Sequence, residues 1–136
     1  MRHCVILAIV LTLAPVLTGT ADASEATAKT VAVIGTGDMG DSLGPRLAGL
    51  GYRIIYGSRD PGSEHVAQLV AATGGDASAA PSRDAAAAAD IVILAVPWPA
   101  METVAQNLGD LDGKIVIDIS MPFAQGEDGY PEHLLP

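Results

Sequence analysis

The strongest structural signal in the sequence is Val31-Ala32-Val33-Ile34-Gly35-Thr36-Gly37-Asp38-Met39-Gly40. The first four residues form a short apolar run, which is typical of a strand buried on both faces of a parallel sheet. The glycines follow at once with the spacing G-x-G-x-x-G, and leucines at helical spacing come after them. In this setting the three glycines permit a tight turn, the approach of a pyrophosphate to the backbone, and close helix-to-strand packing. The pattern therefore predicts a strand, a phosphate-binding turn and a helix, with a turn that merely joins strand to helix as the alternative.

Segments with strand and helix patterns alternate through the rest of the chain. Most strands are predicted where apolar residues run without interruption, and most helices where they recur every three or four positions. Residues 76–80 are assigned as a short strand although alanine and serine are poor strand formers, and the alanine-rich residues 82–89 as a short helix, with a low-complexity linker as the alternative. The predicted strands cover residues 31–34, 53–56, 76–80, 91–96 and 115–119, and the predicted helices cover 39–50, 61–73, 82–89 and 101–108. Because no hairpin signal interrupts this order, we predict an α/β fold with a Rossmann-type doubly wound parallel sheet in a single domain. Its ligand crevice should lie at the carboxyl ends of the strands.

Several residues indicate where these helices should begin and bend. Asp60 is expected to cap the second helix with Pro61 at the first helical position, and Ser82 is expected to cap the third. Pro45 lies inside the first predicted helix and removes the backbone bond to the Asp41 carbonyl. We therefore expect a kink there, or a helix that starts closer to the proline.

The end of the second predicted strand indicates which dinucleotide the glycine-rich turn would hold. A site for NAD usually has Asp or Glu about 20 residues after the glycines, where it accepts hydrogen bonds from the ribose 2′-hydroxyl. This chain has Gly57 and Ser58 there, followed by Arg59. A serine hydroxyl and a planar guanidinium both donate to a 2′-phosphate, and the guanidinium can also stack on adenine. NADP(H) is therefore the predicted cofactor, and a solvated surface arginine is the alternative for Arg59.

Composition limits the classes to which the protein can belong. The chain has 136 residues, of which 49% are hydrophobic and 17% charged, as expected for one folded domain. The formal net charge is -9, with only seven Lys and Arg residues. Nucleic acid is therefore excluded as the main partner, because phosphate backbones are bound by clustered basic side chains.

The N-terminal residues are typical of a secretory signal peptide. Met1-Arg2-His3 is a short basic start, residues 4–17 are almost wholly apolar, and Ala21-Asp22-Ala23 places small residues at a cleavage site. The apolar run is shorter than the roughly 20 residues of a stable membrane-spanning helix. We therefore predict cleavage after residue 23 and export to the periplasm or the medium, with no stable membrane span afterwards. A buried N-terminal helix or a misassigned start is the alternative, and the protein would then be cytoplasmic.

These observations divide the chain into four parts. Residues 1–23 are the predicted signal peptide, 24–30 a small, polar linker, and 31–122 the predicted NADP-binding domain. Residues 123–136 show no periodicity and contain several prolines and glycines, so an irregular tail is expected there. The tail is either a natural end or a truncation.

The sequence shows no pattern of a catalytic acid and base. His65 falls on the second predicted helix and His133 in the tail, and we expect both to be solvated. No metal-ligand spacing is found, so no metal site is predicted and the catalytic residues stay unassigned. Hydride transfer from NADPH needs no dedicated acid or base. An oxidoreductase that passes hydride to a small acceptor therefore stays open beside a nucleotide-binding module without turnover.

Four segments resemble a known family, the NADP-binding domain of the deazaflavin-dependent NADP oxidoreductases. The same domain type occurs in pyrroline-carboxylate reductases and in the cytosolic domain of STEAP-type ferric reductases. The resemblance implies a deazaflavin, a flavin or another small molecule as the hydride acceptor. The resemblance covers residues 31–122, and the stretch Gly57-Ser58-Arg59-Asp60-Pro61 is its most specific part. The other matching segments are Val33-Ile34-Gly35-Thr36-Gly37-Asp38-Met39-Gly40, Ile93-Leu94-Ala95-Val96-Pro97 and Lys114-Ile115-Val116-Ile117-Asp118.

The resemblance implies roles for these residues. Thr36 to Met39 would contact the pyrophosphate, Ser58 and Arg59 the 2′-phosphate, and Ala95-Val96-Pro97 the adjoining ribose and nicotinamide. Many relatives have Asn-Pro after the last strand, whereas this chain has Met121-Pro122. Relatives also continue into a second domain that completes the acceptor site and often a dimer, so we expect either a homo-oligomer or a missing second domain.

Overall fold

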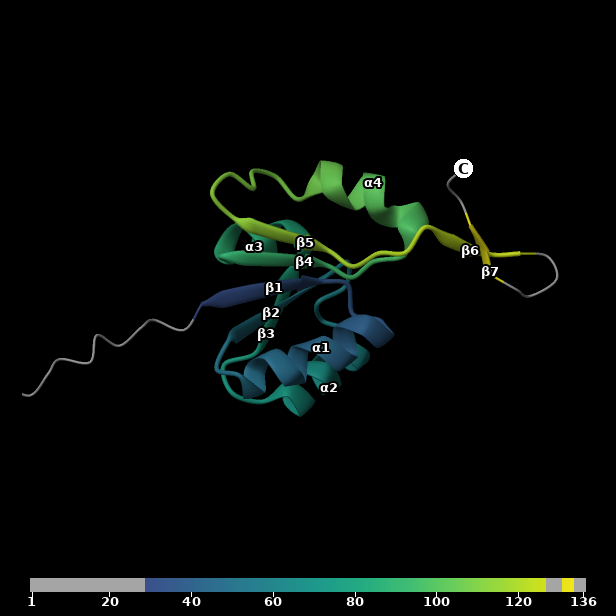
Figure 1. Ribbon diagram of the computed structural model, residues 1–136. Coiled ribbons are helices and arrows are strands. Elements are labelled where there is room, and N and C mark those ends of the chain that lie inside the picture. Colours follow the sequence, from purple (N-terminus) through teal and green to yellow (C-terminus); the bar gives the residue numbers. More distant parts are fainter. Residues whose placement is uncertain (1–28, 127–130, 134–136) are drawn as a thin grey trace, which may run out of the picture.

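The computed structural model describes residues 29–126 and 131–133. Strands and helices alternate between residues 30 and 118 as predicted (Figure 1). The elements that form the domain are β1 (Thr30–Ile34), α1 (Asp38–Gly49), β2 (Arg53–Ser58), α2 (Glu64–Thr73), β3 (Ser78–Pro81), α3 (Ser82–Ala88), β4 (Ile91–Leu94), α4 (Trp98–Asn107) and β5 (Ile115–Asp118). The first strand begins one residue earlier than predicted, because Thr30 already pairs with Arg53.

The five strands form one parallel sheet in the order β3-β2-β1-β4-β5. The order reverses beside β1, which is the switch point where ligands bind in open α/β sheets. The helices α1 and α2 lie side by side on one face, and α3 packs against β1 and β2 from the other (Figure 1). The predicted Rossmann-type sheet in a single domain is thereby confirmed.

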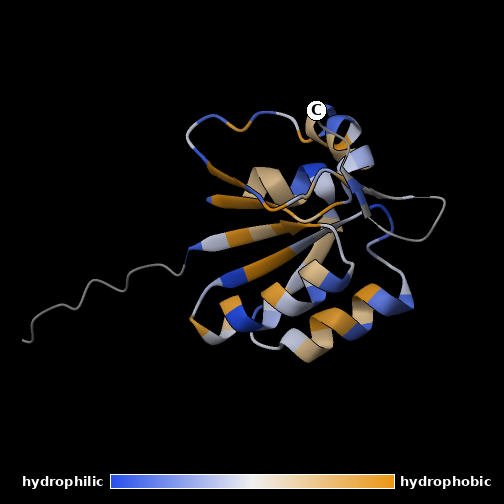
Figure 2. Ribbon diagram, turned by 45° about the vertical axis from the view of Figure 1, so that its right-hand side comes forward, coloured by the Kyte–Doolittle hydropathy of each residue, from blue (hydrophilic) through white to orange (hydrophobic). Residues whose placement is uncertain are grey.

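The core is divided by the sheet into two apolar clusters. Alternate residues of β1 point to opposite faces, so Val31 and Val33 pack under α1 and α2 while Ala32 and Ile34 pack under α3. The central strands are mostly hydrophobic, and hydrophobic and hydrophilic residues alternate along the helices (Figure 2). This sheet fixes the carboxyl ends of β1, β2 and β4 at one edge.

Several helix boundaries differ from the prediction. Asp60 does not cap α2: the helix begins at Glu64, and the Ser63 hydroxyl accepts the Val66 N–H at 3.5 Å. Ser82 does not cap α3 either, because the capping position is Pro81 and Ser82 is the first helical residue. Serine and aspartate are both good N-cap residues, but a turn at residues 61–63 precedes α2, and β3 leads directly into α3 at Pro81. The helix α1 begins at Asp38 and continues across Pro45, so a start closer to the proline was wrong.

One further prediction is corrected at the end of the chain. The predicted irregular tail contains β6 (Phe123–Gln125) and β7 (Pro131–His133), which pair antiparallel. Strands of three residues are too short to show periodicity, and a proline is tolerated at the end of an edge strand.

The strand β5 is apolar but not buried, since Ile115, Val116 and Ile117 are 55%, 44% and 41% exposed. As an edge strand it has a neighbour only on the β4 side among the described residues.

The predicted signal peptide lies outside the described residues and stays a prediction. Among the residues that the structure describes, no helix combines the length and apolarity needed to cross a bilayer.

Candidate functional site

The glycine-rich loop between β1 and α1 has the geometry that its spacing predicts. Gly35 has φ +112°, and a Cβ there would collide with the Ala95 carbonyl oxygen. A Cβ on Gly40 would collide with the Gly35 carbonyl oxygen, so α1 approaches the loop as closely as glycine allows. Gly37 differs, because a Cβ there would meet no described atom within 4 Å. The first and third glycines are thus required by the fold, whereas the second leaves open space beside the backbone.

The N-terminus of α1 presents unpaired donors at this open space. Its capping residue is Gly37, which has no side chain to bond the first turn, and the first helical bond runs from the Asp41 N–H to the Gly37 carbonyl at 2.9 Å. Backbone N–H groups ahead of that bond have no partner within the helix. Such a helix start binds phosphate groups, because its donors and its dipole both favour negative charge.

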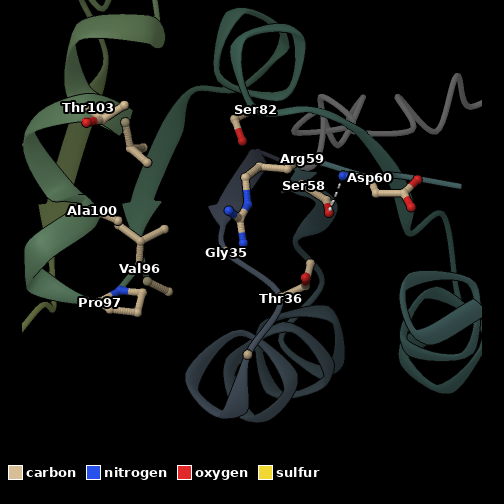
Figure 3. A pocket seen from close by; sticks show the side chains of 14 residues that line it. Gly35, Thr36, Ser58, Arg59, Asp60, Ser82, Val96, Pro97, Ala100 and Thr103 are labelled. Carbon is tan, nitrogen blue, oxygen red and sulfur yellow. Dashed lines mark hydrogen bonds between the residues drawn. The ribbon is translucent and has the colours of Figure 1, made fainter. Parts of the chain in front are cut away.

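A cavity of about 820 Å³ extends from this loop across the carboxyl ends of the strands (Figure 3). Five segments form its walls: the glycine-rich loop, the end of β2, the start of α3, the loop after β4, and one face of α4. The lining residues are Gly35, Thr36, Gly37, Gly57, Ser58, Arg59, Asp60, Ser82, Ala95, Val96, Pro97, Ala100, Thr103 and Val104. This volume falls within the range of ligand pockets, which is about 300–1,000 Å³.

Arg59 supplies the positive charge in this cavity. Its side chain extends from the end of β2 into the space between the glycine-rich loop and α4 (Figure 3). No other lysine or arginine lines the cavity among the described residues. The Ser58 hydroxyl lies beside it and accepts the Asp60 N–H at 3.2 Å, which leaves its own proton for another acceptor. The two residues predicted for a 2′-phosphate therefore lie together at one end of the cavity.

The cavity walls include most, but not all, of the predicted site residues. Eight of them line it: Gly35, Thr36, Gly37, Ser58, Arg59, Ala95, Val96 and Pro97. Asp38 and Met39 are exposed in the first turn of α1, and Gly40 is buried beneath the loop. These three residues do not line the cavity, so only the backbone N–H groups of the first helical turn can bind a ligand there.

Other lining residues were not predicted from the sequence. Ser82 reaches the cavity because β3 ends at the same edge as β2, and Ser82 directly follows it. Ala100, Thr103 and Val104 lie on one face of α4, where helical spacing is equally typical of core packing. The end of the third predicted strand could have indicated Ser82, because parallel strands end at one edge. The face of α4 depends on how the helix docks, which the spacing does not specify.

His65 is not simply solvated as expected. Its Nε2 lies 2.6 Å from the Thr36 carbonyl oxygen in the glycine-rich loop and 3.7 Å from Asp41 Oδ1. The imidazole therefore joins α2 to the loop, although its side chain is 55% exposed. Among the described residues no group of three or more His, Cys, Asp or Glu side chains could hold a metal ion.

Comparisons with known proteins agree with this geometry. The sequence profile of the family described as "NADP oxidoreductase coenzyme F420-dependent" matches residues 30–122. The F420-dependent NADP reductase of Methanothermobacter thermautotrophicus is 39% identical over 99 residues, which cover 68% of this chain and 43% of that protein. The F420-dependent NADP reductase of Methanocaldococcus jannaschii is 34% identical over 109 residues, covering 74% of this chain and 48% of that protein. This chain thus spans less than half the length of these curated relatives.

Solved structures show the same similarity in three dimensions. A protein from Arthrobacter sp. FB24, provisionally described as an F420-dependent NADP reductase, superposes with a TM-score of 0.67 at 28% identity, covering 76% of this chain and 50% of that one. An imine reductase from a Pseudomonas species superposes with a TM-score of 0.59 at 26% identity, covering 69% of this chain and 33% of that one. With the family profile matching most of the chain, the resemblance inferred from the glycine-rich loop and the Ser58-Arg59 pair is confirmed. The chain belongs to the family of F420-dependent NADP oxidoreductases.

Proposed function

We propose that this chain binds NADP(H) along the cavity and presents it for hydride exchange with a deazaflavin such as coenzyme F420. The observation that carries the proposal is the Arg59 guanidinium, which extends into the cavity beside the Ser58 hydroxyl. A guanidinium makes charge-assisted bonds to phosphate, and the adjacent hydroxyl can add another. The names of the matched relatives, F420-dependent NADP reductases, support the same cofactor and acceptor.

The residues present fit a dinucleotide. The open space at Gly37 and the free donors of α1 suit the pyrophosphate, while Arg59 suits the adenosine 2′-phosphate. In the reaction NADPH loses a hydride and becomes NADP+, and the deazaflavin gains that hydride together with a proton from solvent. The role of this chain's residues is to bind and orient the cofactor.

A second candidate is a nucleotide-binding module that needs another segment or a second copy before it turns over. The observation behind it is that the matched regions cover 43% and 48% of two reductases that the chain resembles, so more than half of each reductase lies outside the match. Comparing NADPH binding with the rate of NADPH oxidation in the presence of F420 separates the two candidates.

The cofactor assignment is tested by Arg59→Ala. If the guanidinium bonds the 2′-phosphate, NADPH affinity should fall by about tenfold to a hundredfold and NADH affinity should stay nearly unchanged. Nicotinamide fluorescence or calorimetry measures both ligands. Arg53→Ala is the matched control, because Arg53 lies at the opposite end of β2, outside the cavity. Equal losses of NADPH and NADH in Arg59→Ala would reject the NADP(H) assignment.

A further inference from the structure

His65 and the glycine-rich loop are joined by a hydrogen bond that the sequence did not indicate. The Thr36 carbonyl oxygen lies 2.6 Å from His65 Nε2, and a carbonyl oxygen can only accept. Nε2 therefore carries the proton, in either the neutral or the charged imidazole. The bond connects α2 to a loop 29 residues earlier in the chain.

This bond fixes the direction of a neighbouring backbone donor. The described residues contain no cis peptide bond, so the Thr36 carbonyl and the Gly37 N–H point to opposite sides of one planar peptide group. Because the carbonyl faces His65 on α2, the Gly37 N–H faces away from α2. Thr36 and Gly37 both line the cavity, and no hydrogen bond among the described residues uses the Gly37 N–H.

The Asp41 carboxylate lies beside the imidazole. Its Oδ1 lies 3.7 Å from His65 Nε2, is buried, and has no hydrogen-bond partner among the described residues. Nε2 thus lies close to two acceptors, the loop carbonyl and a carboxylate in the first turn of α1. Both favour the orientation in which the imidazole N–H faces the loop.

We propose that His65 is a positioning residue for the cofactor pyrophosphate. By holding the Thr36 carbonyl, it keeps the Gly37 N–H directed away from α2, as a donor to the phosphate groups at the start of α1. His65 itself touches neither the cofactor nor the acceptor. This inference rests on the proposed binding of NADP(H) in the same cavity.

The test compares ligands with and without a pyrophosphate. In His65→Leu, the affinities for NADPH and for NADH should both fall by about two- to tenfold, which corresponds to the loss of one hydrogen bond. The affinity for adenosine 2′-monophosphate should stay unchanged, because that ligand has the 2′-phosphate but no pyrophosphate. His65→Gln places an amide N–H near the position of Nε2 and should restore much of the affinity. Gln68→Leu is the matched control, since Gln68 is exposed on the same helix and bonds only Glu64.

Failure of the positioning role of His65 can be distinguished from failure of the NADP(H) assignment. Arg59→Ala should show a different pattern, with NADPH and adenosine 2′-monophosphate both weakened and NADH nearly unchanged. Unchanged NADPH affinity in His65→Leu, or an equal loss of adenosine 2′-monophosphate, would overturn the positioning role while leaving NADPH binding in place. Absence of NADPH binding by the wild-type chain would instead reject the proposed function, and the role of His65 with it. Because the His65 side chain is 55% exposed, the thermal midpoint of His65→Leu should fall by no more than about 8 °C, the shift expected for the loss of one hydrogen bond in a domain of this size, and a cooperative transition serves as the folding check.

Discussion

Gly35 and Gly37 lie in the glycine-rich loop and Gly40 in the first turn of α1, and their surroundings give each a different consequence on replacement. Gly35 has a positive φ and lies against the Ala95 carbonyl, while Gly40 lies against the Gly35 carbonyl. Gly37 has an ordinary φ of -92° and nothing described within 4 Å of a Cβ. A methyl group at Gly37 would therefore occupy space that is open to a ligand, without colliding with the described protein atoms.

Gly37→Ala should separate binding from folding. We expect NADPH affinity to fall by at least about tenfold, because the methyl group would prevent the pyrophosphate from approaching the backbone. The free energy of unfolding should fall by about 1 kcal/mol or less, the difference between glycine and alanine at an N-cap. NADPH titration and urea unfolding measure the two effects.

Gly40→Ala is the contrasting variant. Its Cβ would meet the Gly35 carbonyl oxygen, so the loop must shift, and the free energy of unfolding should fall by about 1–3 kcal/mol. Equal losses of unfolding free energy in Gly37→Ala and Gly40→Ala would contradict the open space that the structure shows at Gly37.

The residues of the site were predictable only where a local pattern specifies them. The glycine spacing and the Ser58-Arg59 pair depend on a few consecutive positions, and both were found. Thr103 and the Thr36 contact of His65 depend on how α4 and α2 dock against other elements. A histidine on an exposed helix face has no neighbour in sequence to indicate a partner 29 residues away.

At the scale of elements, α1 packs closely against β2 through Gly44. A Cβ on Gly44 would collide with the Tyr56 ring, which is fully buried, and the Tyr56 hydroxyl is held by Thr73 Oγ1 at 2.7 Å. Alanine is a better helix former than glycine by about 1 kcal/mol, so propensity alone favours Gly44→Ala. The collision outweighs this gain because neither the ring nor the helix can move freely.

Gly44→Ala should therefore lower the free energy of unfolding by about 1–3 kcal/mol, measured by urea denaturation. Gly49→Ala in the same helix is the matched control, since a Cβ there meets nothing within 4 Å. That variant should be neutral or stabilising by up to about 1 kcal/mol. A stabilised Gly44→Ala would show that α1 does not approach β2 this closely.

Tyr56 also makes stability depend on pH. Burial raises the pKa of the Tyr56 phenol above its ordinary value of 10.0, the Thr73 hydrogen bond lowers it, and the Asp41 charge raises it, with burial the largest influence. The folded chain thus holds this proton more tightly than the unfolded chain, so the associated stability is complete below about pH 10 and is lost as the pH rises through the folded pKa. Between pH 9 and pH 11 or so, the free energy of unfolding should fall more steeply in the wild type than in Tyr56→Phe. Identical slopes in the wild type and Tyr56→Phe would contradict the assignment.

The order of most elements was predictable because β1, β2, β4 and β5 each contain a short apolar run and α1, α2 and α4 each have a repeating apolar face. The exact helix starts were not, since Ser63 and Pro81 took the capping positions expected of Asp60 and Ser82. Such shifts depend on the segment that precedes each helix, a turn before α2 and the end of β3 before α3. The pairing of β6 with β7 depends on contacts between residues that no local pattern connects.

At the scale of the whole molecule, the predicted export of this chain can be tested directly. We propose that residues 1–23 are removed, because the basic start, the apolar run and Ala21-Asp22-Ala23 occur in the order that signal peptidase requires. Mass analysis of the protein from its native host should give Ser24 as the first residue, in an extracytoplasmic fraction. An intact Met1 in a cytoplasmic fraction would reject export and place the protein where NADPH is made.

The exposed strand β5 has a consequence for how the protein behaves in solution. An uncovered edge with apolar side chains on both faces is a template on which another strand can add. The net charge of -9 opposes such association, because like-charged molecules repel one another. Salt shortens the range of that repulsion to about 10 Å at 0.1 M, whereas the attraction between apolar surfaces is not screened in this way. Raising the ionic strength therefore weakens the electrostatic contacts to the cofactor and also favours association between neighbouring molecules. Colloidal stability and cofactor affinity have to be measured at the same salt concentration for this reason.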